Sequence, residues 1–441
     1  MKFIQTLKNI WKIEDLRKRL TITFLFILIY RFGCQVVLPG INPNDLNQAL
    51  ETFTNKSGLM QLLDMFSGGA FSQASIFALG IMPYITASIV IQLLGMVLPS
   101  FQKMQREGES GRMKLNQYTR YLTVLILLVQ APAYLLNLRY QVASAGGTVD
   151  LSPLNMVFLT IVLTAGAMFI MWLGEKITDK GIGNGISLII FVGIIARFPG
   201  AFSEEFSGRL TSAQGGLVMF LVEIIVLFAV TAGAVMLTQG TRKVPVQYAK
   251  RIVGNKQYGG ARQYIPLKVN AANVMPIIFA QALLFIPLTL AGFNSEGSGF
   301  AAAFSDINGF WYNLVYFILI VLFTYFYTAI TVRPTQMAEE MKKNSGFIPG
   351  IKPGKKTAEY LDSIMSRITL PGSIFLGIVA IMPAFARLFG VNQHFAQFFG
   401  GTSLLITVGV VLDTLQQIET HLRMHHYDGL MKSGKIKGRA S

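Results

Sequence analysis

The sequence has a single cysteine, Cys34, among 441 residues. One cysteine excludes an internal disulfide framework and a metal site built from several thiolates. Histidine is also scarce: the four histidines fall in predicted loops or the C-terminal tail, and no nearby cysteine or carboxylate completes a convincing metal site. We therefore expect no metal and no cofactor, and we interpret Cys34 as an ordinary helix residue.

Charged residues are few as well: they make up 14% of the chain, whereas 52% is hydrophobic. This balance is typical of a membrane protein. A helix needs about 20 apolar residues to cross the hydrocarbon core. We predict an all-α polytopic membrane protein with ten transmembrane helices. The predicted spans are Leu20–Leu38, Ile76–Leu98, Tyr121–Leu138, Pro153–Leu173, Ile186–Phe198, Leu217–Leu237, Val274–Leu290, Trp311–Val332, Ile368–Leu388 and Thr402–Ile418.

The chain has a net charge of +16, and its basic residues lie between the apolar runs. This distribution is better explained by the positive-inside rule of membrane topology than by nucleic-acid binding. Alternate segments carry 32 of the 38 basic residues: the N-terminus, 99–120, 174–185, 238–273, 333–367 and the tail after Ile418. We therefore place both termini in the cytoplasm. The first apolar run is too long for the core of a signal peptide and is expected to be a retained helix.

Two of the predicted spans are irregular. The stretch Leu62–Leu98 is too long for one crossing, and its first part is too polar and glycine-rich to face lipid. It predicts a half-helix at about 59–75 that folds back into the protein before a full span begins near Ile76. The fifth span, Ile186–Phe198, is predicted to be short, as expected beside a cavity or a thinned membrane.

Ten helices divide into two sets of five, and an odd number forces the second set to run inverted to the first. A Met-Pro pair recurs in helices two and seven, within Gly80–Ile85 and Asn273–Ile278. We predict two inverted, pseudo-symmetric halves around a central pore. They comprise residues 1–198 and 199–420, followed by a basic cytoplasmic tail, 421–441.

The sequence shows no motif of catalytic residues. The ionisable groups predicted inside the membrane are Arg31, Glu223 and Asp413, for which a helix–helix hydrogen bond is favoured. Nucleotide-binding loops, nucleophile elbows and paired catalytic carboxylates are absent, which argues against an enzyme. A secondary transporter for a small solute stays an alternative, although its polar midplane site is not seen. A membrane-embedded transferase would lose activity on mutation of Glu223 and Asp413.

Two long cytoplasmic loops, 238–273 and 333–367, mix basic side chains with tyrosines or with Gly/Pro turns. Lys250, Arg251, Lys256 and Arg262 belong to the first loop. Such loops exceed what connecting two helices requires, so they are candidate docking surfaces for a large cytosolic partner, ribosomal RNA included. Topology alone would also gather Lys and Arg there, and the residues leave both readings open.

Several ordered blocks of the chain resemble the bacterial SecY family of protein-translocation channels, from helix one to helix ten. The matching blocks are Met65–Ala70, Ser75–Ile85, Glu107–Arg112, Gln117–Arg120, Gly181–Ser187, Pro266–Asn270, Phe347–Ile351 and Gly400–Ile406.

The resemblance implies a channel that translocates unfolded secretory polypeptides and releases membrane segments sideways into the bacterial cytoplasmic membrane. It implies an apolar ring at the waist of the pore, formed by Ile81, Ile85, Ile186, Ile190, Ile278 and Ile406. The spacing agrees, because Ile81/Ile85 and Ile186/Ile190 are i, i+4 pairs on one helix face. Such a ring excludes dehydrated ions while flexible side chains close around a passing chain.

The resemblance also implies a plug, a lateral gate and a set of partners. The plug would include Leu62, Met65, Phe66, Ser67, Gly68, Gly69 and Ala70, and the polar gate positions would be Gln92 and Asn270. The implied partners are the membrane subunits SecE and SecG, the motor ATPase SecA, the ribosome, the translocated polypeptides and the lipid bilayer. Lys352 stands where the family usually has an arginine. In a contact with the motor, lysine would keep the positive charge but could not form the paired hydrogen bonds of a planar guanidinium.

Overall fold

The computed structural model describes residues 13–42, 64–144, 152–211, 216–248, 251–253, 256–258, 262–272, 274–281, 283–284 and 309–432. The chain divides into two compact units, Met1–Gly200 with Val410–Ser441, and Ala201–Gly409. The predicted halves part at nearly the same position, but the units assign the residues from Val410 onward to the first unit.

Long apolar runs produce the helices, because inside a membrane the backbone polar groups must be satisfied within the segment. Across the described residues, seven helices are long and apolar enough to span a membrane, and the bent pair of α5 (Met82–Val97) and α6 (Pro99–Arg106) makes up to eight. The first predicted span begins within α2 (Glu14–Gly33), but the helix ends at Gly33, so the predicted residues 34–38 lie beyond it. The seventh is helical at 275–281 and 283–284, and its remainder lies outside the described residues.

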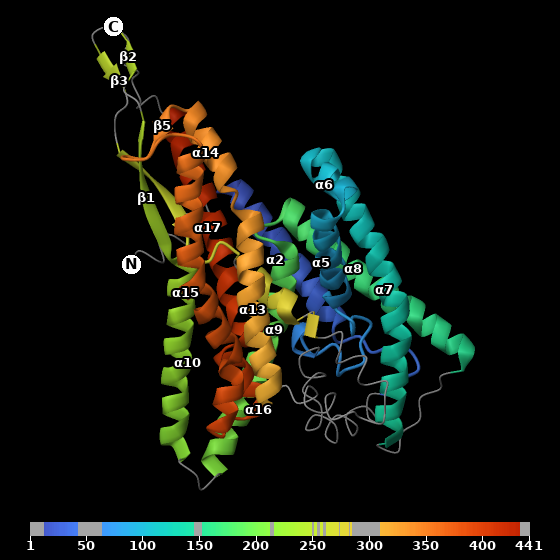
Figure 1. Cartoon of the computed structure of the whole chain (residues 1–441). Coiled ribbons are helices and arrows are strands. Elements are labelled where there is room, and N and C mark those ends of the chain that lie inside the picture. The colour runs from blue at the N-terminus through green and yellow to red at the C-terminus, as the bar shows by residue number, and fades with distance from the viewer. Residues whose placement is uncertain are drawn as a thin grey trace. The chain divides into compact units, whose positions relative to one another are not determined.

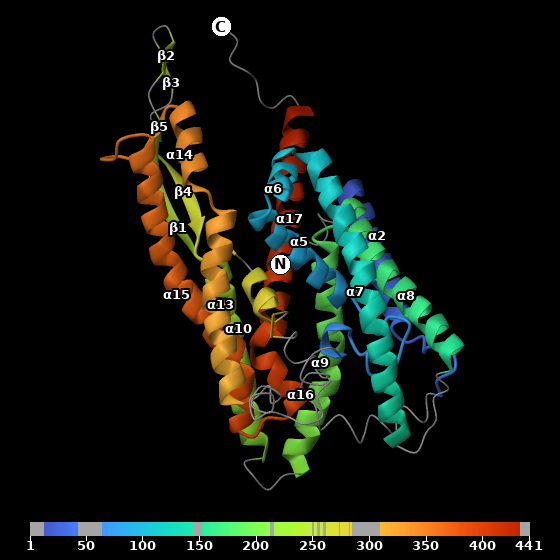
Figure 2. The same ribbon diagram turned by 45° about the vertical axis from the view of Figure 1, so that its right-hand side comes forward.

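In the first unit, α7 (Glu109–Ser144) packs against both α5 and α8 (Pro153–Lys180), and α8 packs against α2. Figures 1 and 2 show α2, α7 and α8 running side by side. Next along the chain comes α9 (Gly185–Thr211), which begins in this unit and ends in the second. The last helix, α17 (Gly401–Lys432), likewise contributes to both units.

The second unit is built on α10 (Gly216–Gln239), α13 (Phe310–Thr331) and α15 (Lys355–Leu388), with α13 packed along α15. Its lesser helices are α14, α16 and the 3-10 turn η1. Their bounds are Pro334–Lys343, Gln393–Ala396 and Gln397–Phe399. Figure 1 shows α14 and a small sheet at one end of α13 and α15.

The segment 238–273, expected as a loop, forms a β-hairpin. Strand β1 (Thr241–Tyr248) pairs antiparallel with β4 (Arg262–Lys268), and β5 (Gly346–Phe347) joins the other edge of β1. Between them, β2 (Arg251–Val253) pairs with β3 (Lys256–Tyr258). Val244 and Val246 alternate with exposed residues and pack with Leu267, Met341 and residues of α15 in a small core. The hairpin is therefore a folded platform rather than an irregular connection.

Two local predictions are wrong. The fifth span is not short, because α9 continues through Pro199 to Thr211. A proline inside a membrane helix is tolerated where neighbouring groups satisfy the freed carbonyl. Nor is 59–75 a half-helix as far as it is described: residues 64–66 form one helical turn and 67–81 are a succession of turns and a bridge. Glycines at positive φ, Gly68 and Gly69, end the helix.

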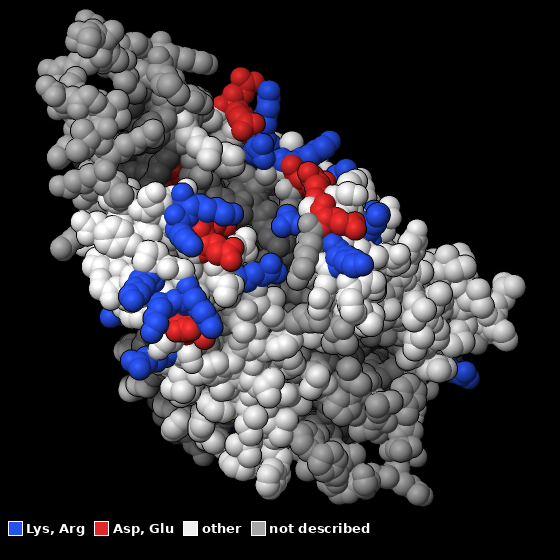
Figure 3. Space-filling view, turned by 45° about the horizontal axis from the view of Figure 1, so that its top comes forward, with Lys and Arg blue, Asp and Glu red and all other residues white. Residues whose placement is uncertain are grey.

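The surface agrees with a membrane location. Large apolar side chains stand exposed along the helices, among them Phe24 on α2 (68% exposed) and Val218 on α10 (75%). On the face seen in Figure 3, most of the described charged side chains are gathered in one region, and the rest of the described surface on that face is nearly free of charge. A soluble protein rarely exposes contiguous apolar surface on this scale, so these helix faces contact lipid or other membrane helices.

Candidate functional site

Residues 64–75 form a compact segment inside the first unit, which we call the plug segment after the role that the resemblance implies. Met65, Phe66 and Ala70 are buried, at 5% exposure or less. The segment lies so close to α9 that a Cβ atom on Gly68 would stand 2.8 Å from the Cα atom of Gly193. Gly68 also adopts φ +66°, where only glycine is unstrained. Both features explain why glycine occupies this position.

An ion pair joins the start of the plug segment to α9. The Asp64 carboxylate pairs with the Arg197 guanidinium, and their side chains are 10% and 30% exposed. The same guanidinium donates to the Ser72 hydroxyl (2.9 Å), and the Ser72 amide donates to the Asp64 carboxylate (2.8 Å). Asp64, Ser72 and Arg197 thus close a triangle that holds both ends of the turn against α9.

Helix α2 holds the middle of the plug segment. The Tyr30 hydroxyl donates to the Ser67 carbonyl (3.3 Å), and the Arg31 guanidinium donates to the Gly68 carbonyl (2.7 Å). These carbonyls lie in a turn, so they lack the partners that a helix would supply, and burying them without donors would be unfavourable. Arg31 is therefore committed to the plug segment rather than to an ion pathway.

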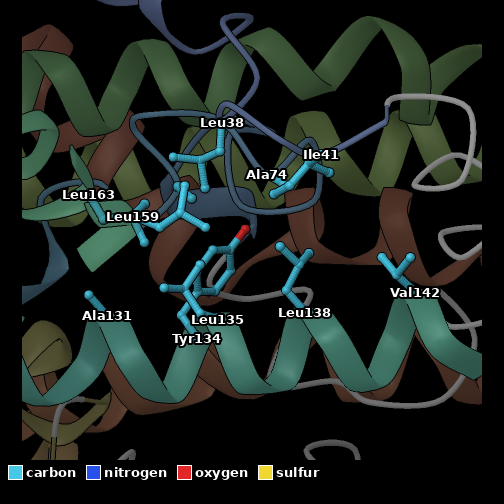
Figure 4. Close-up of a cluster of buried hydrophobic side chains, with 11 residues drawn as sticks. Leu38, Ile41, Ala74, Ala131, Tyr134, Leu135, Leu138, Val142, Leu159 and Leu163 are labelled. Atoms are coloured by element: carbon cyan, nitrogen blue, oxygen red, sulfur yellow. The ribbon is translucent and has the colours of Figure 1, made fainter. Parts of the chain in front are cut away.

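The far end of the plug segment packs into an apolar cluster. Phe71 contacts this cluster, and its carbonyl accepts a hydrogen bond from the Tyr134 hydroxyl (2.8 Å). Figure 4 shows the ring of Tyr134 on α7 beside Leu135 and below Leu159, with Leu38 and Ala74 opposite. The Leu38 amide also donates to the Ala74 carbonyl (2.9 Å), and Val37 bridges to Ser75. The segment is anchored on α2, α7 and α9 together.

The six predicted ring residues range from buried to partly buried. Ile81, Ile190 and Ile406 are 2–3% exposed, and Ile85, Ile186 and Ile278 are partly buried. Ile81 precedes α5, Ile85 lies on α5, Ile186 and Ile190 on α9, Ile278 on the helix at 275–281, and Ile406 on α17. By contrast, Ile195 on α9 is 44% exposed.

One face of α9 carries both ring residues and plug contacts. Ile186, Ile190, Gly193 and Arg197 follow each other at spacings of four, three and four residues, which places them in one stripe along the helix. Gly193 touches the backbone of the plug segment and Arg197 holds Asp64. The stripe that seats the plug segment thus continues directly into the predicted ring.

The other predicted site residues are separate from this cluster. Gln92, on α5, donates to the Ser88 hydroxyl (3.4 Å), and Asn270 is buried in the turn after β4. Lys352 is exposed ahead of α15, while Arg251, Lys256 and Arg262 lie on the strands of the hairpin. Leu62 and Lys250 lie outside the described residues.

Sequence reasoning missed the two charged residues that matter most in the first unit, Asp64 and Arg197. Arg197 falls within the predicted fifth span, and a charge in a membrane span is itself a functional signal. Glu223 has the helix–helix role that was favoured for it: Arg209 on α9 bonds Glu223 on α10 (2.5 Å) and Glu205 (2.8 Å). Arg209 also donates to the Gly390 carbonyl, and the Asn392 amide donates to Glu205. Within the described residues no group of three His, Cys, Asp or Glu side chains could hold a metal ion.

These features define a class: a polytopic helical membrane protein that encloses a folded-back segment of its own chain. The SecY family model matches residues 75–415. SecY subunits of the protein translocase from Streptomyces coelicolor and Mycobacterium bovis are 43% and 41% identical to the chain. Their alignments cover 96% and 98% of it, and 98% and 99% of the relatives. The chain belongs to the SecY family and is a channel-family protein, not an enzyme.

Solved structures agree at the level of the fold. A structure described as a protein-conducting channel superposes with a TM-score of 0.64 at 21% identity, over 92% of each chain. A second, at 20% identity with the same score and coverage, concerns the SecY plug domain, described as stabilising the closed state of that channel and maintaining a membrane seal. Sec61 of a canine ribosome–channel complex superposes with a TM-score of 0.61 at 20% identity, over 92% of each chain.

Proposed function

We propose that the chain conducts unfolded secretory polypeptides across the cytoplasmic membrane of a bacterium and releases membrane segments sideways into the bilayer. The observation that carries this proposal is the stripe on α9, in which Ile186 and Ile190 lead directly to the residues that hold the plug segment. An apolar waist with a folded plug at its end suits a passage that must admit chains of any sequence and exclude ions.

The pore ring of the proposed channel consists of Ile81, Ile85, Ile186, Ile190, Ile278 and Ile406, with residues 64–75 as the described part of the plug. Gln92 and Asn270 line the lateral gate. A hydrophobic signal segment parts this gate by binding the open state better than the closed one. The charges inside the described spans do not favour a solute transporter, because Arg197 and Arg209 are engaged in ion pairs with Asp64, Glu205 and Glu223.

The proposed orientation places both termini in the cytoplasm, together with the β1–β4 hairpin and the turn at Lys352. It rests on the concentration of basic residues in these segments. The hairpin and this turn serve as docking surfaces for the ribosome and for the motor SecA. SecE and SecG are the proposed companions in the membrane, where exposed apolar faces such as that of α10 are available to helices or lipid.

Crosslinking of an arrested secretory chain tests the proposal. Single cysteines replace Ile81, Ile278 and Ile406 in turn, in a chain whose Cys34 is replaced by serine. We expect all three to crosslink to the arrested chain. Matched cysteines at the exposed positions Phe24 and Val218 should not, because these side chains face outward. Labelling of the exposed positions alone would contradict the conduit.

A further inference from the structure

Asp64 is the one charged residue of the plug segment, and no other charged residue follows it before position 80. Two arginines from different helices reach the segment: Arg197 from α9 and Arg31 from α2. The two contacts differ in kind. Arg31 donates to a neutral backbone carbonyl, whereas Arg197 meets a carboxylate that is 10% exposed. Both hydrogen bonds are charge-assisted, but the Asp64–Arg197 contact adds the attraction between two opposite charges, so it is the stronger of the two.

We propose that Asp64 and Arg197 form a latch that holds the plug segment seated and sets how often the resting channel opens. This inference rests on the proposed plug. The latch stabilises the turn of the segment as well as its position on α9. The Asp64 carboxylate also accepts a hydrogen bond from the Ser72 amide, and Arg197 donates one to the Ser72 hydroxyl. Releasing Arg197 therefore loosens the turn between Asp64 and Ser72 at the same time.

The exposures of the two partners suit a latch that must open. The Arg197 side chain is 30% exposed, so water can solvate the guanidinium as soon as the pair separates. Asp64 leaves with the segment and regains its own hydration. A pair sealed fully in the apolar interior would leave two unsolvated charges on separation, which is far less favourable. The arrangement holds the closed state without making the open state inaccessible.

The position of Arg197 links the latch to the ring. Arg197, Gly193 and Ile190 lie in the same stripe of α9, and Gly193 contacts the plug backbone. A movement of this face of α9 away from the plug segment would displace Ile190 and the Arg197 guanidinium together, and so separate the guanidinium from Asp64. Opening of the waist and release of the plug are therefore mechanically coupled through one helix face. In this scheme Arg197 and Asp64 are positioning residues, since neither needs to touch the translocated chain.

The latch is tested by the opening frequency of the resting channel, recorded for the full translocase complex in planar bilayers. The variants are Asp64→Asn, Arg197→Gln, the double variant and the conservative Arg197→Lys. Each single loss should raise the opening frequency roughly tenfold, the population shift expected when a hydrogen bond between charged groups is lost at a partly buried site. The double variant should open no more often than the worse single variant, because both changes remove the same contact. Arg197→Lys should stay near the wild type.

Two controls separate the latch from the plug and from general damage. Deleting Leu62–Ser72 removes the plug itself and sets the upper limit of leak. Arg120→Gln breaks a comparable Arg–carboxylate pair, with Glu175, between α7 and α8 of the same unit without touching the plug segment. If the deletion leaks but Asp64→Asn and Arg197→Gln do not, the latch is wrong and the plug stands. A tight channel after the deletion refutes the plug itself. Additive effects in the double variant, or equal leak from Arg120→Gln, overturn the latch.

Discussion

Gly68 and Gly193 touch backbone to backbone. A Cβ atom built on Gly193 would lie 3.1 Å from the Phe66 carbonyl oxygen and 3.3 Å from the Gly68 amide nitrogen. Close approach of a turn to a helix requires that neither residue carry a side chain at the contact. The contact between Gly68 and Gly193 determines how closely the plug segment approaches α9. This close approach also brings Asp64 within reach of Arg197.

A larger side chain at Gly193 should unseat the plug. Gly193→Leu forces its side chain into the backbone of residues 66–68, and overpacking of this kind costs about 1–3 kcal/mol. We expect the resting ion leak through the channel to rise while translocation continues. Gly208→Leu, on an open face of the same helix, is the matched control, since a Cβ there meets nothing within 4 Å. Equal leak from both variants would argue against a specific seat.

A polar substitution in the predicted apolar ring tests whether the ring excludes ions. Ile190→Ser replaces a buried apolar side chain with a hydroxyl that can solvate a passing ion, which lowers the barrier that excludes it. We expect ion conductance during translocation to increase by several fold. Ile195→Ser, on the exposed side of α9, should leave conductance unchanged. The reverse ranking of the two variants in single-channel recordings would place the ring elsewhere.

Most helices follow directly from the sequence, because an apolar run of membrane length has few alternatives to a helix. Thus α8, α10 and α15 contain the spans predicted there. The β1–β4 hairpin was not predicted: Val244 and Val246 have the two-residue spacing of a strand, but Pro245 stands between them, and proline inside a run argues against a strand. The many basic residues of the segment drew the interpretation toward a loop.

The candidate site was less accessible to sequence reasoning. The plug segment was located by its glycines and polar residues, but its turns and its partners were not. Ser72 and Arg197 are 125 residues apart, and no spacing rule connects a turn to a helix at that distance. The same holds for Tyr134, which bonds Phe71 across 63 residues. Periodicity reports which face of one helix is apolar, whereas these contacts depend on which helices become neighbours.

Lys352 provides a test of partner docking. Lys352 is exposed in the turn before α15, and a lysine meets a carboxylate as a point charge rather than through a bidentate fork. We expect Lys352→Arg to tighten binding of the motor ATPase to membrane vesicles, and Lys352→Ala to weaken it, each by roughly two- to fivefold. Lys356→Ala, also exposed at the start of α15, is the control. Identical affinities for all four proteins would remove Lys352 from the docking surface.

The Arg209 cluster should govern the stability of the second unit. Glu205 and Glu223 are each 3% exposed, and one guanidinium serves both carboxylates as well as the Gly390 carbonyl. Arg209→Met removes the cation and leaves two buried carboxylates side by side, which should lower the free energy of unfolding by about 3 kcal/mol or more. The measurement is thermal unfolding of the purified protein in detergent.

The expected loss of stability comes from the uncompensated charge rather than from the change in side-chain size, and a compensating variant separates these two causes. Combining Arg209→Met with Glu205→Gln and Glu223→Gln removes all three charges at nearly constant volume. Removing one partner of a buried ion cluster leaves an uncompensated charge and is strongly destabilising, whereas removing all of its charges leaves none. The triple variant should therefore recover most of the lost thermal stability. If it remains as unstable as Arg209→Met, the bonds of Arg209 to the Gly390 carbonyl and its packing, not charge balance, hold α9 to α10 and the turn after α15.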